Sequence, residues 1–220
     1  MRVRVYVDGF NVYYGAKRTM GSQTVGWKWL DLDALATRMV GHHWPNALVV
    51  GVDYFTARIK VRPGGDPQAP QRQQIYLRAL EHRGVAIHHG AFQLKQPSRP
   101  LVRDPSVFER FHDTEEKGSD VNLASRLLVD GFQSAYDGAL IVSNDGDLKM
   151  PGELVRRLFR CPLGVLNPQL DKGRSMALSP PSIGPPDFYA KIQAGDFAAC
   201  QLPASMVDSN GRTIRKPTGW

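Results

Sequence analysis

The stretch from Lys117 to Asp147 constrains the fold of this chain more than any other. It reads KGSDVNLASRLLVDGFQSAYDGALIVSNDGD, which predicts an acidic helix start at Asp120, a helix, a buried strand and an acidic turn with Asp145 and Asp147. The N-terminal run MRVRVYVDGFN repeats this design with a β-branched strand that ends in Asp8. Because the carboxyl ends of parallel strands lie at one edge of a sheet, we expect these four carboxylates to lie together.

Helical periodicity defines the direction of the Asp120 side chain. At about 100° per residue, Asp120, Ala124, Leu127 and Gly131 fall within roughly 40° of one line along the helix. This line is the stripe that faces the core. Asp120 should therefore point toward the edge of the sheet and away from bulk water. Asp130, near the other end of the same helix, is expected to pair with an arginine or a lysine, because an acid there opposes the helix dipole.

Strand and helix patterns alternate along most of the chain, which predicts an α/β fold of the Rossmann type. We expect a three-layer α/β/α arrangement with a mainly parallel sheet of about five strands and right-handed crossovers. The predicted strands are 2–8, 48–55, 85–87, 139–142 and 163–166, and the predicted helices are 11–20, 30–40, 71–83, 120–132 and 151–159.

Two regions do not follow this alternation. The segment from Gly90 to Thr114 contains several prolines and basic residues, and it predicts a long functional or disordered loop. We assign residues 1–167 to the domain and residues 168–220 to an irregular C-terminal extension, which packs on the domain or trails from it. Within the extension, 187–192 is predicted as a helix and the tail ends either packed through Trp220 or frayed.

Composition limits the environment of the protein and suggests a class of partner. The 220 residues are 42% hydrophobic, enough for a buried core, and Cys161 and Cys200 have no metal or redox spacing, which suggests a reducing compartment. We expect a cytoplasmic protein, because the N-terminus lacks the apolar run of a signal peptide and no stretch approaches the ~20 apolar residues of a membrane span. The formal charge of +7 favours an anionic partner such as nucleic acid, although many basic proteins have none.

Several basic and aromatic residues are candidates for contact with a nucleic acid. Arg58, Lys60 and Arg62 alternate, so they would share one side of an extended segment, with Lys95, Arg99 and Arg103 as further candidates. Lys117 either meets a phosphate or is solvated. The rings of Tyr13, Trp27 and Trp29 either stack on bases or belong to the core.

Four carboxylates at one edge would repel each other unless a cation lies between them. Mg²⁺ and similar hard ions prefer oxygen ligands, and such an ion can activate water for hydrolysis of a phosphodiester. The structural alternative is that Asp120 caps a helix and that Asp145 and Asp147 stabilise a turn.

Three motifs carry a resemblance to a known family. YVDGFNVYY, KGSDVNLASRLL and IVSNDGDL, in this order, resemble the NYN domain family of PIN-like nucleases and are most similar to its bacterial LabA-like branch. The resemblance covers residues 1 to about 167, and the final KPTGW is also similar to the ends of such proteins. It implies a Rossmann-like domain, a metal site and RNA cleavage.

The resemblance also implies roles for individual residues. Asp8, Asp120, Asp145 and Asp147 would bind Mg²⁺ or Mn²⁺, Asn11 would orient the site or touch substrate, and Ser143 would brace the aspartates. Asn144 stands where many members have Gly, and Leu148 where many have Phe. Neither difference removes a carboxylate.

Together these observations predict a metal-dependent endoribonuclease that acts on single-stranded or structured RNA. Its products would carry a 5′-phosphate and a 3′-hydroxyl. Two alternatives remain open: an RNA-binding or regulatory module with little catalysis, and a small-molecule enzyme, since some relatives carry names that imply ring hydroxylation. A homodimer is also considered.

Overall fold

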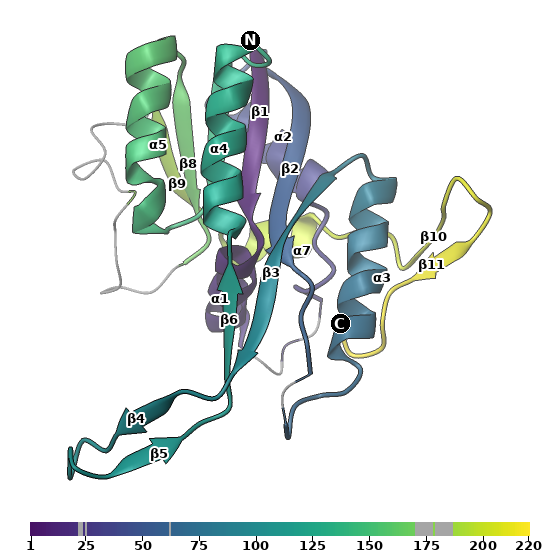
Figure 1. Ribbon diagram of the computed structural model, residues 1–220. Coiled ribbons are helices and arrows are strands. Elements are labelled where there is room, and N and C mark those ends of the chain that lie inside the picture. The colour runs from purple at the N-terminus through teal and green to yellow at the C-terminus, as the bar shows by residue number, and fades with distance from the viewer. Residues whose placement is uncertain (22–23, 25, 62, 170–177, 179–186) are drawn as a thin grey trace.

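A seven-stranded sheet forms the centre of the molecule (Figure 1). The structure is a computed structural model that describes the chain except residues 22, 23, 25, 62, 170–177 and 179–186. The strands of this sheet are, in chain order, β1 (Arg2–Asp8), β2 (Leu48–Ala57), β3 (Ala86–Lys95), β6 (Asp113–Lys117), β7 (Gly138–Val142), β8 (Leu163–Asn167) and β9 (Phe188–Lys191). Their spatial order is β6-β3-β2-β1-β7-β8-β9.

All neighbouring strands in this sheet are parallel except β6, which runs antiparallel to β3. The mainly parallel α/β fold is therefore confirmed. The expectation of about five strands is wrong, because β6 and β9 are added at the two edges of the sheet.

Helices cover both faces of the sheet, in three layers. They are α1 (Gly9–Met20), α2 (Leu32–His43), α3 (Ala69–His82), α4 (Ser119–Phe132), α5 (Lys149–Leu154) and α7 (Ala194–Ala199), with the short 3-10 helix η1 (Gly146–Leu148) before α5 and the π-helical segment η2 (Val155–Phe159) after it. Successive side chains of β1 point to opposite faces of the sheet, so the protein has two hydrophobic cores. Val5 belongs to the core formed with α1, α2, α3 and α7, and Tyr6 belongs to the core formed with α4 and η2 on the other face. Among the described residues, no helix is both long and apolar enough to cross a membrane.

A buried ionic network joins the centre of the sheet to α4. Arg4 Nε lies 2.7 Å from Asp53 Oδ2 and 3.1 Å from Asp130 Oδ2, and both carboxylates are fully buried. Arg126 Nε also contacts Asp130 Oδ2, at 3.0 Å, and the Tyr6 hydroxyl donates to the same oxygen. The predicted pairing of Asp130 with an arginine is thus confirmed.

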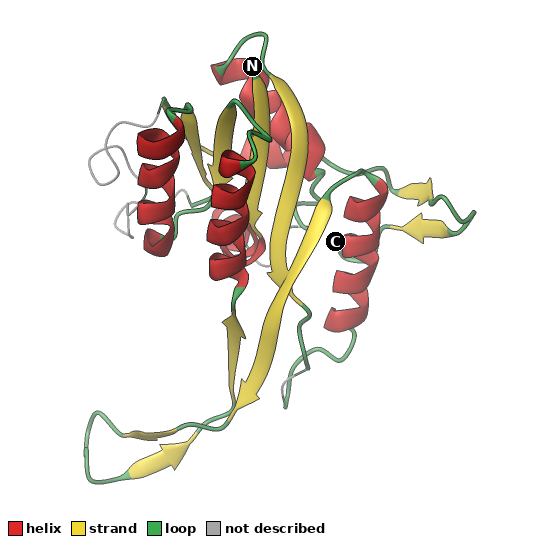
Figure 2. Ribbon diagram, turned by 45° about the horizontal axis from the view of Figure 1, so that its top comes forward, coloured by secondary structure: helices red, strands yellow, loops and turns green. Residues whose placement is uncertain are grey.

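The region from Gly90 to Thr114 is not the long loop that we expected. β3 continues to Lys95 and pairs with β6, and beyond this pair β4 (Ser98–Pro100) and β5 (Phe108–Arg110) form a small hairpin that extends away from the body (Figure 2). The sequence of β6 is DTEEK, without any apolar alternation. Such a strand is tolerated at a sheet edge, where charged side chains reach solvent, so its pattern did not predict it.

The helix expected over 187–192 is also wrong, since β9 occupies this segment and pairs in parallel with β8. Asp187 fixes the start of β9, because its Oδ2 accepts a hydrogen bond of 2.7 Å from the backbone N–H of Leu163. Most of the irregular stretch expected between 168 and 186 lies outside the described residues.

The C-terminal tail is packed. A hairpin of β10 (Ser205–Val207) and β11 (Thr213–Arg215) leads to Trp220, whose ring centroid lies 6.3 Å from that of Trp29 and 5.8 Å from that of Tyr76. Of the two expectations for the tail, the packed arrangement through Trp220 is confirmed.

Candidate metal site at the carboxyl edge of the sheet

Asp8 ends β1 and also caps α1, so one side chain serves both the strand exit and the helix start. Its Oδ1 accepts from the backbone N–H of Asn11 at 3.0 Å, and its Oδ2 accepts from the Ser143 hydroxyl at 2.9 Å. Only 5% of the residue is exposed. Burial raises the pKa of Asp8 to about 7, these hydrogen bonds oppose the rise, and the charges of Asp120 and Asp145 add to it.

Asp120 lies in the first turn of α4 but does not cap this helix. The cap position is Gly118, which has a left-handed backbone (φ +89°) that favours glycine. Among the described residues, no hydrogen bond to the Asp120 carboxylate is found. Burial, followed by the charges of Asp145, Glu116 and Asp147, raises the pKa of Asp120 to about 6.

Asp145 follows β7 in the turn that leads into η1. Its backbone N–H donates to the Ser143 hydroxyl at 3.0 Å, and its Oδ1 accepts from the backbone N–H of Asp147, also at 3.0 Å. Ser143, which is completely buried, therefore connects the loop of Asp145 to the carboxylate of Asp8. This is the bracing geometry expected for Ser143.

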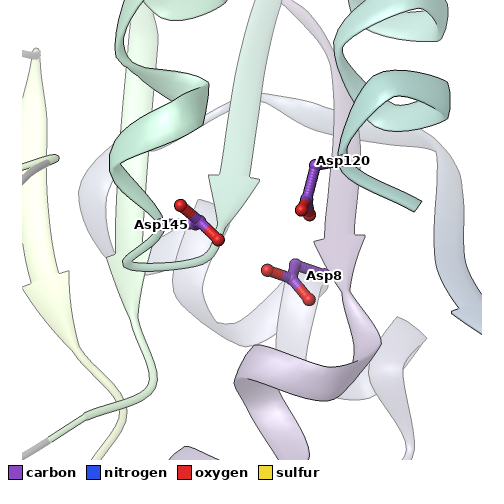
Figure 3. Close-up of side chains that lie close together, drawn as sticks. All are labelled: Asp8, Asp120 and Asp145. Carbon is purple, nitrogen blue, oxygen red and sulfur yellow. The ribbon is translucent and has the colours of Figure 1, made fainter. Parts of the chain in front are cut away.

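The carboxylates of Asp8, Asp120 and Asp145 face one common space (Figure 3). One carboxylate oxygen from each lies within 4.8 Å of the other two. Three oxygens at this spacing suit a divalent ion, which needs oxygen ligands at ~2.0–2.6 Å. A cation there would also remove the mutual repulsion that raises the pKa values of Asp8 and Asp120. The residues present thus fit a hard metal ion.

Asp147 was expected as a fourth member, and the structure does not bring it into this group. Its side chain is exposed, and its contribution is the backbone hydrogen bond to Asp145. The physical reason is the short η1 turn: once Asp145 caps it, Asp147 lies two residues further and turns to solvent. Its charge still reaches Asp120, where it is the weakest of the named influences on the pKa.

An open pocket of about 260 Å³ surrounds the three carboxylates. The predicted Asn11 is part of its wall, and its Oδ1 accepts from the backbone N–H of Asn144 at 3.2 Å and from Gln169 Nε2 at 3.4 Å. The remaining wall residues were not predicted: Phe10, Tyr14, Arg18, Glu116 and Gln169. The spacing of three and four residues between Asn11, Tyr14 and Arg18 is a sequence signal that indicates one helix face.

The predicted basic residues lie apart from the acidic pocket or have partners of their own. Lys117 Nζ contacts Glu115 Oε1 at 2.8 Å, and Lys95 pairs with the same glutamate. Arg58 and Lys60 are exposed just beyond β2, and Arg62 lies outside the described residues. The other two lie in the β4–β5 region: Arg99, paired with Asp113, and Arg103, which is exposed.

The aromatic candidates divide between core and surface. Trp27 and Trp29 are buried, 3% and 0% exposed, and the indole N–H of Trp29 donates to Pro203 O at 2.9 Å. The core alternative therefore holds for these two tryptophans. Tyr13 is 42% exposed and remains accessible.

The chain is similar to known proteins both in fold and in sequence. A crystal structure of a Vibrio parahaemolyticus protein of unknown function is similar with a TM-score of 0.53 at 18% identity, covering 91% of this chain and 96% of the other. A Pseudomonas putida protein named 6-hydroxy-3-succinoylpyridine 3-monooxygenase HspA is 29% identical over 100% of this chain and 75% of that protein. The NYN domain family matches residues 2–160, which include all three carboxylates. The chain therefore belongs to the NYN domain family, whose fold is PIN-like.

Proposed function

We propose that this protein is a metal-dependent ribonuclease that cleaves RNA internally. The observation that carries the proposal is the convergence of Asp8, Asp120 and Asp145 within 4.8 Å at the carboxyl edge of the sheet of an NYN domain. Half-buried and buried carboxylates at this spacing are costly without a cation. The net charge of +7 supports a polyanionic substrate, because the acidic pocket leaves the rest of the chain still more basic.

In this proposal, Asp8, Asp120 and Asp145 hold Mg²⁺ or Mn²⁺. The ion, when bound, would polarise a phosphate oxygen and lower the pKa of a water molecule. Ser143 orients Asp8 by donating to its Oδ2, and the same hydroxyl fixes the Asp145 backbone. Asn11 holds the Asn144 backbone and the Gln169 side chain at the pocket wall.

The remaining candidates have peripheral roles in the proposal. Asp147 acts through its charge and its support of the Asp145 loop. Arg18, at the pocket wall, is near enough to the acidic pocket to meet a phosphate, while Lys117, Arg58 and Lys60 contribute to long-range attraction of RNA. Cleavage by water leaves a 5′-phosphate and a 3′-hydroxyl. Membership of the LabA-like branch, a cytoplasmic location and a homodimer are further parts of this proposal.

A cleavage assay on a labelled RNA with single-stranded and hairpin regions tests the function. We expect cleavage by the wild type in Mg²⁺ or Mn²⁺ and none in EDTA. Asp145→Asn should abolish cleavage and leave RNA affinity nearly unchanged, since phosphate contacts dominate binding. Glu153→Gln, which removes one exposed charge from α5, is the matched control.

The outcomes separate the proposal from a regulatory module. Binding without cleavage in any divalent metal would identify an RNA-binding NYN protein. Equal cleavage by Asp145→Asn and wild type would refute the assigned site.

A second candidate is hydroxylation of a small aromatic acid, favoured by the similarity to the Pseudomonas putida monooxygenase, which covers 100% of this chain and 75% of that protein. The acidic pocket has features that such a substrate could use: rings of Phe10 and Tyr14 and the guanidinium of Arg18. A test incubates the protein with the pyridine substrate that this relative's name states, a two-electron donor and oxygen. Substrate-dependent consumption of the donor, unaffected by EDTA, would favour this candidate over the nuclease.

A further inference from the structure

One face of α1 carries a continuous series of aromatic rings that passes through the acidic pocket. We call this series the aromatic row, and its members in spatial order are Phe92, Phe10, Tyr14, Tyr13 and Trp27. Phe10 and Tyr14 belong to the same pocket wall as the three carboxylates. Beyond Tyr14 the row continues through Tyr13 to Trp27, which are not part of that wall.

The rings follow each other at contact distances. Phe10 lies 6.4 Å from Phe92 and 6.5 Å from Tyr14, with 23° between the ring planes in both pairs. Tyr13 lies 5.3 Å from Tyr14, nearly perpendicular to it, and 5.4 Å from Trp27. Such contacts hold each ring in place, so little side-chain freedom is lost when a flat ligand binds.

The middle of the row is accessible. Tyr14 is 50% exposed and Tyr13 is 42% exposed, and both lie on the solvent side of α1. These two exposed tyrosines are not part of the hydrophobic core, because α1 packs on it through other residues, among them Val12 and Ala16. An exposed aromatic surface of this kind indicates a binding site.

Cations lie near both ends of the row: Arg18 is part of the acidic pocket wall, and Lys28 lies beside Trp27. Lys17 and Arg18 lie in the last turn of α1, and Lys28 Nζ is 5.4 Å from the centre of the Trp27 ring. Burial, then the positive charges of Arg72 and Lys17, lower the pKa of Lys28. The far end of the row is thus electropositive and suited to phosphate groups.

A small recess closes the far end. Its volume is about 40 Å³, and Tyr13, Trp27 and Lys28 line part of it. Trp27 is 97% buried, and its indole N–H has no hydrogen-bond partner among the described residues. A buried donor of this kind needs an acceptor, and the recess has room for one oxygen atom of a water or a ligand.

We propose that the aromatic row, through its exposed rings Tyr13 and Tyr14, binds single-stranded RNA by base stacking and guides it into the acidic pocket. This inference rests on the proposed nuclease function and specifies its substrate as unpaired RNA. Exposed rings with interspersed cations are the means by which proteins bind single strands, because each base has a flat face and each phosphate a charge. Paired bases are already stacked inside the duplex and cannot use the row.

Fluorescence anisotropy in EDTA measures the role of the row without cleavage. The probe is a labelled oligouridylate of about 12 nucleotides, within the site sizes of single-strand binders. Tyr14→Ala should weaken binding by about 5- to 100-fold, while Tyr14→Phe, which keeps the ring, should stay within about twofold of the wild type. Phe132→Ala is the matched control, since Phe132 is 73% exposed at the opposite end of α4.

Salt dependence and a duplex probe separate stacking from charge. Tyr14→Ala should leave the slope of log affinity against log salt unchanged, whereas Arg18→Ala should reduce it by about 0.7, one phosphate contact. Binding of a duplex of equal length should be the same for Tyr14→Ala and wild type. A melting curve for each variant verifies folding, and Tyr14 is exposed enough for its removal to be tolerated.

The proposal is overturned if Tyr14→Ala binds the oligouridylate within about twofold of the wild type, or if it loses duplex and single-strand binding equally. It is also overturned if Tyr14→Ala dissociates a dimer in sedimentation and keeps its RNA affinity, because the row is then a protein interface. A cleavage assay in Mg²⁺ is independent of these results. Tyr14-dependent binding without cleavage would refute catalysis alone, and cleavage without Tyr14-dependent binding would refute the row alone.

Discussion

Replacing Asp120 with asparagine should stabilise the metal-free protein at neutral pH. The Asp120 carboxylate lies within 4.8 Å of two other carboxylates and accepts no hydrogen bond from the described residues. Gly118, and not Asp120, occupies the cap position of α4, so the substitution removes no cap. Asparagine keeps the shape of the side chain and removes its charge.

The magnitude follows from the pKa of the group. A rise from 3.8 to about 6 corresponds to at most about 3 kcal/mol of destabilisation when the group is ionised. Solvent screens a half-buried group, and the substitution also loses the attraction of the helix dipole for an acid, so about 1 kcal/mol remains. For a chain of this size, about 1 kcal/mol raises the melting temperature by about 2–4 °C.

The effect depends on pH with a definite sign. Because the folded pKa of Asp120 lies above the unfolded value, the folded protein binds more protons between about pH 4 and pH 6. The contribution of Asp120 to stability is therefore present below about pH 4 and lost as the pH rises through about 6. The advantage of Asp120→Asn should be full at about pH 8 and smaller at about pH 5.

Thermal melts in EDTA and in Mg²⁺ measure this prediction. Mg²⁺ should raise the wild-type melting temperature, since an ion that binds only the folded state stabilises it, and should raise that of Asp120→Asn less. Asp147→Asn should have a smaller effect, because its carboxylate is outside the group, and Glu153→Gln should have almost none. A lower melting temperature for Asp120→Asn in EDTA, with no response of the wild type to Mg²⁺, would refute the reasoning.

Three further substitutions test the framework of the site. Arg4→Met leaves two buried carboxylates without their shared arginine and should destabilise the protein by about 3–5 kcal/mol in urea unfolding. Gly9→Ala places a Cβ 2.5 Å from the Tyr54 ring next to the acidic pocket, so it should lower stability by about 1–3 kcal/mol and weaken the Mg²⁺-dependent shift in melting temperature. Trp220→Ala removes a ring that packs on Trp29 and should cost about 1–3 kcal/mol without changing that shift.

The acidic residues show how much of the site could be predicted from local sequence patterns. Asp8 and Asp145 could be located from the sequence because each follows a strand of apolar residues, and parallel strands place their carboxyl ends together. The direction of the Asp120 side chain could be predicted from helical periodicity alone. Asp147 has the same residue type and nearly the same position, yet its direction depends on the tight turn that Asp145 caps. Residue spacing does not specify such a turn.

What the sequence determined by itself is the alternating α/β plan and the edge at which the site lies. These follow from local periodicity and from the topology of parallel strands, both of which are encoded within short segments. Tertiary structure decided the seven-stranded width, the projecting hairpin and the strand at Phe188–Lys191. It also decided the aromatic row, whose rings come from three segments. Edge strands and surface clusters form through contacts with residues that are distant in the chain. The local sequence of such a segment therefore says little about the structure that it adopts.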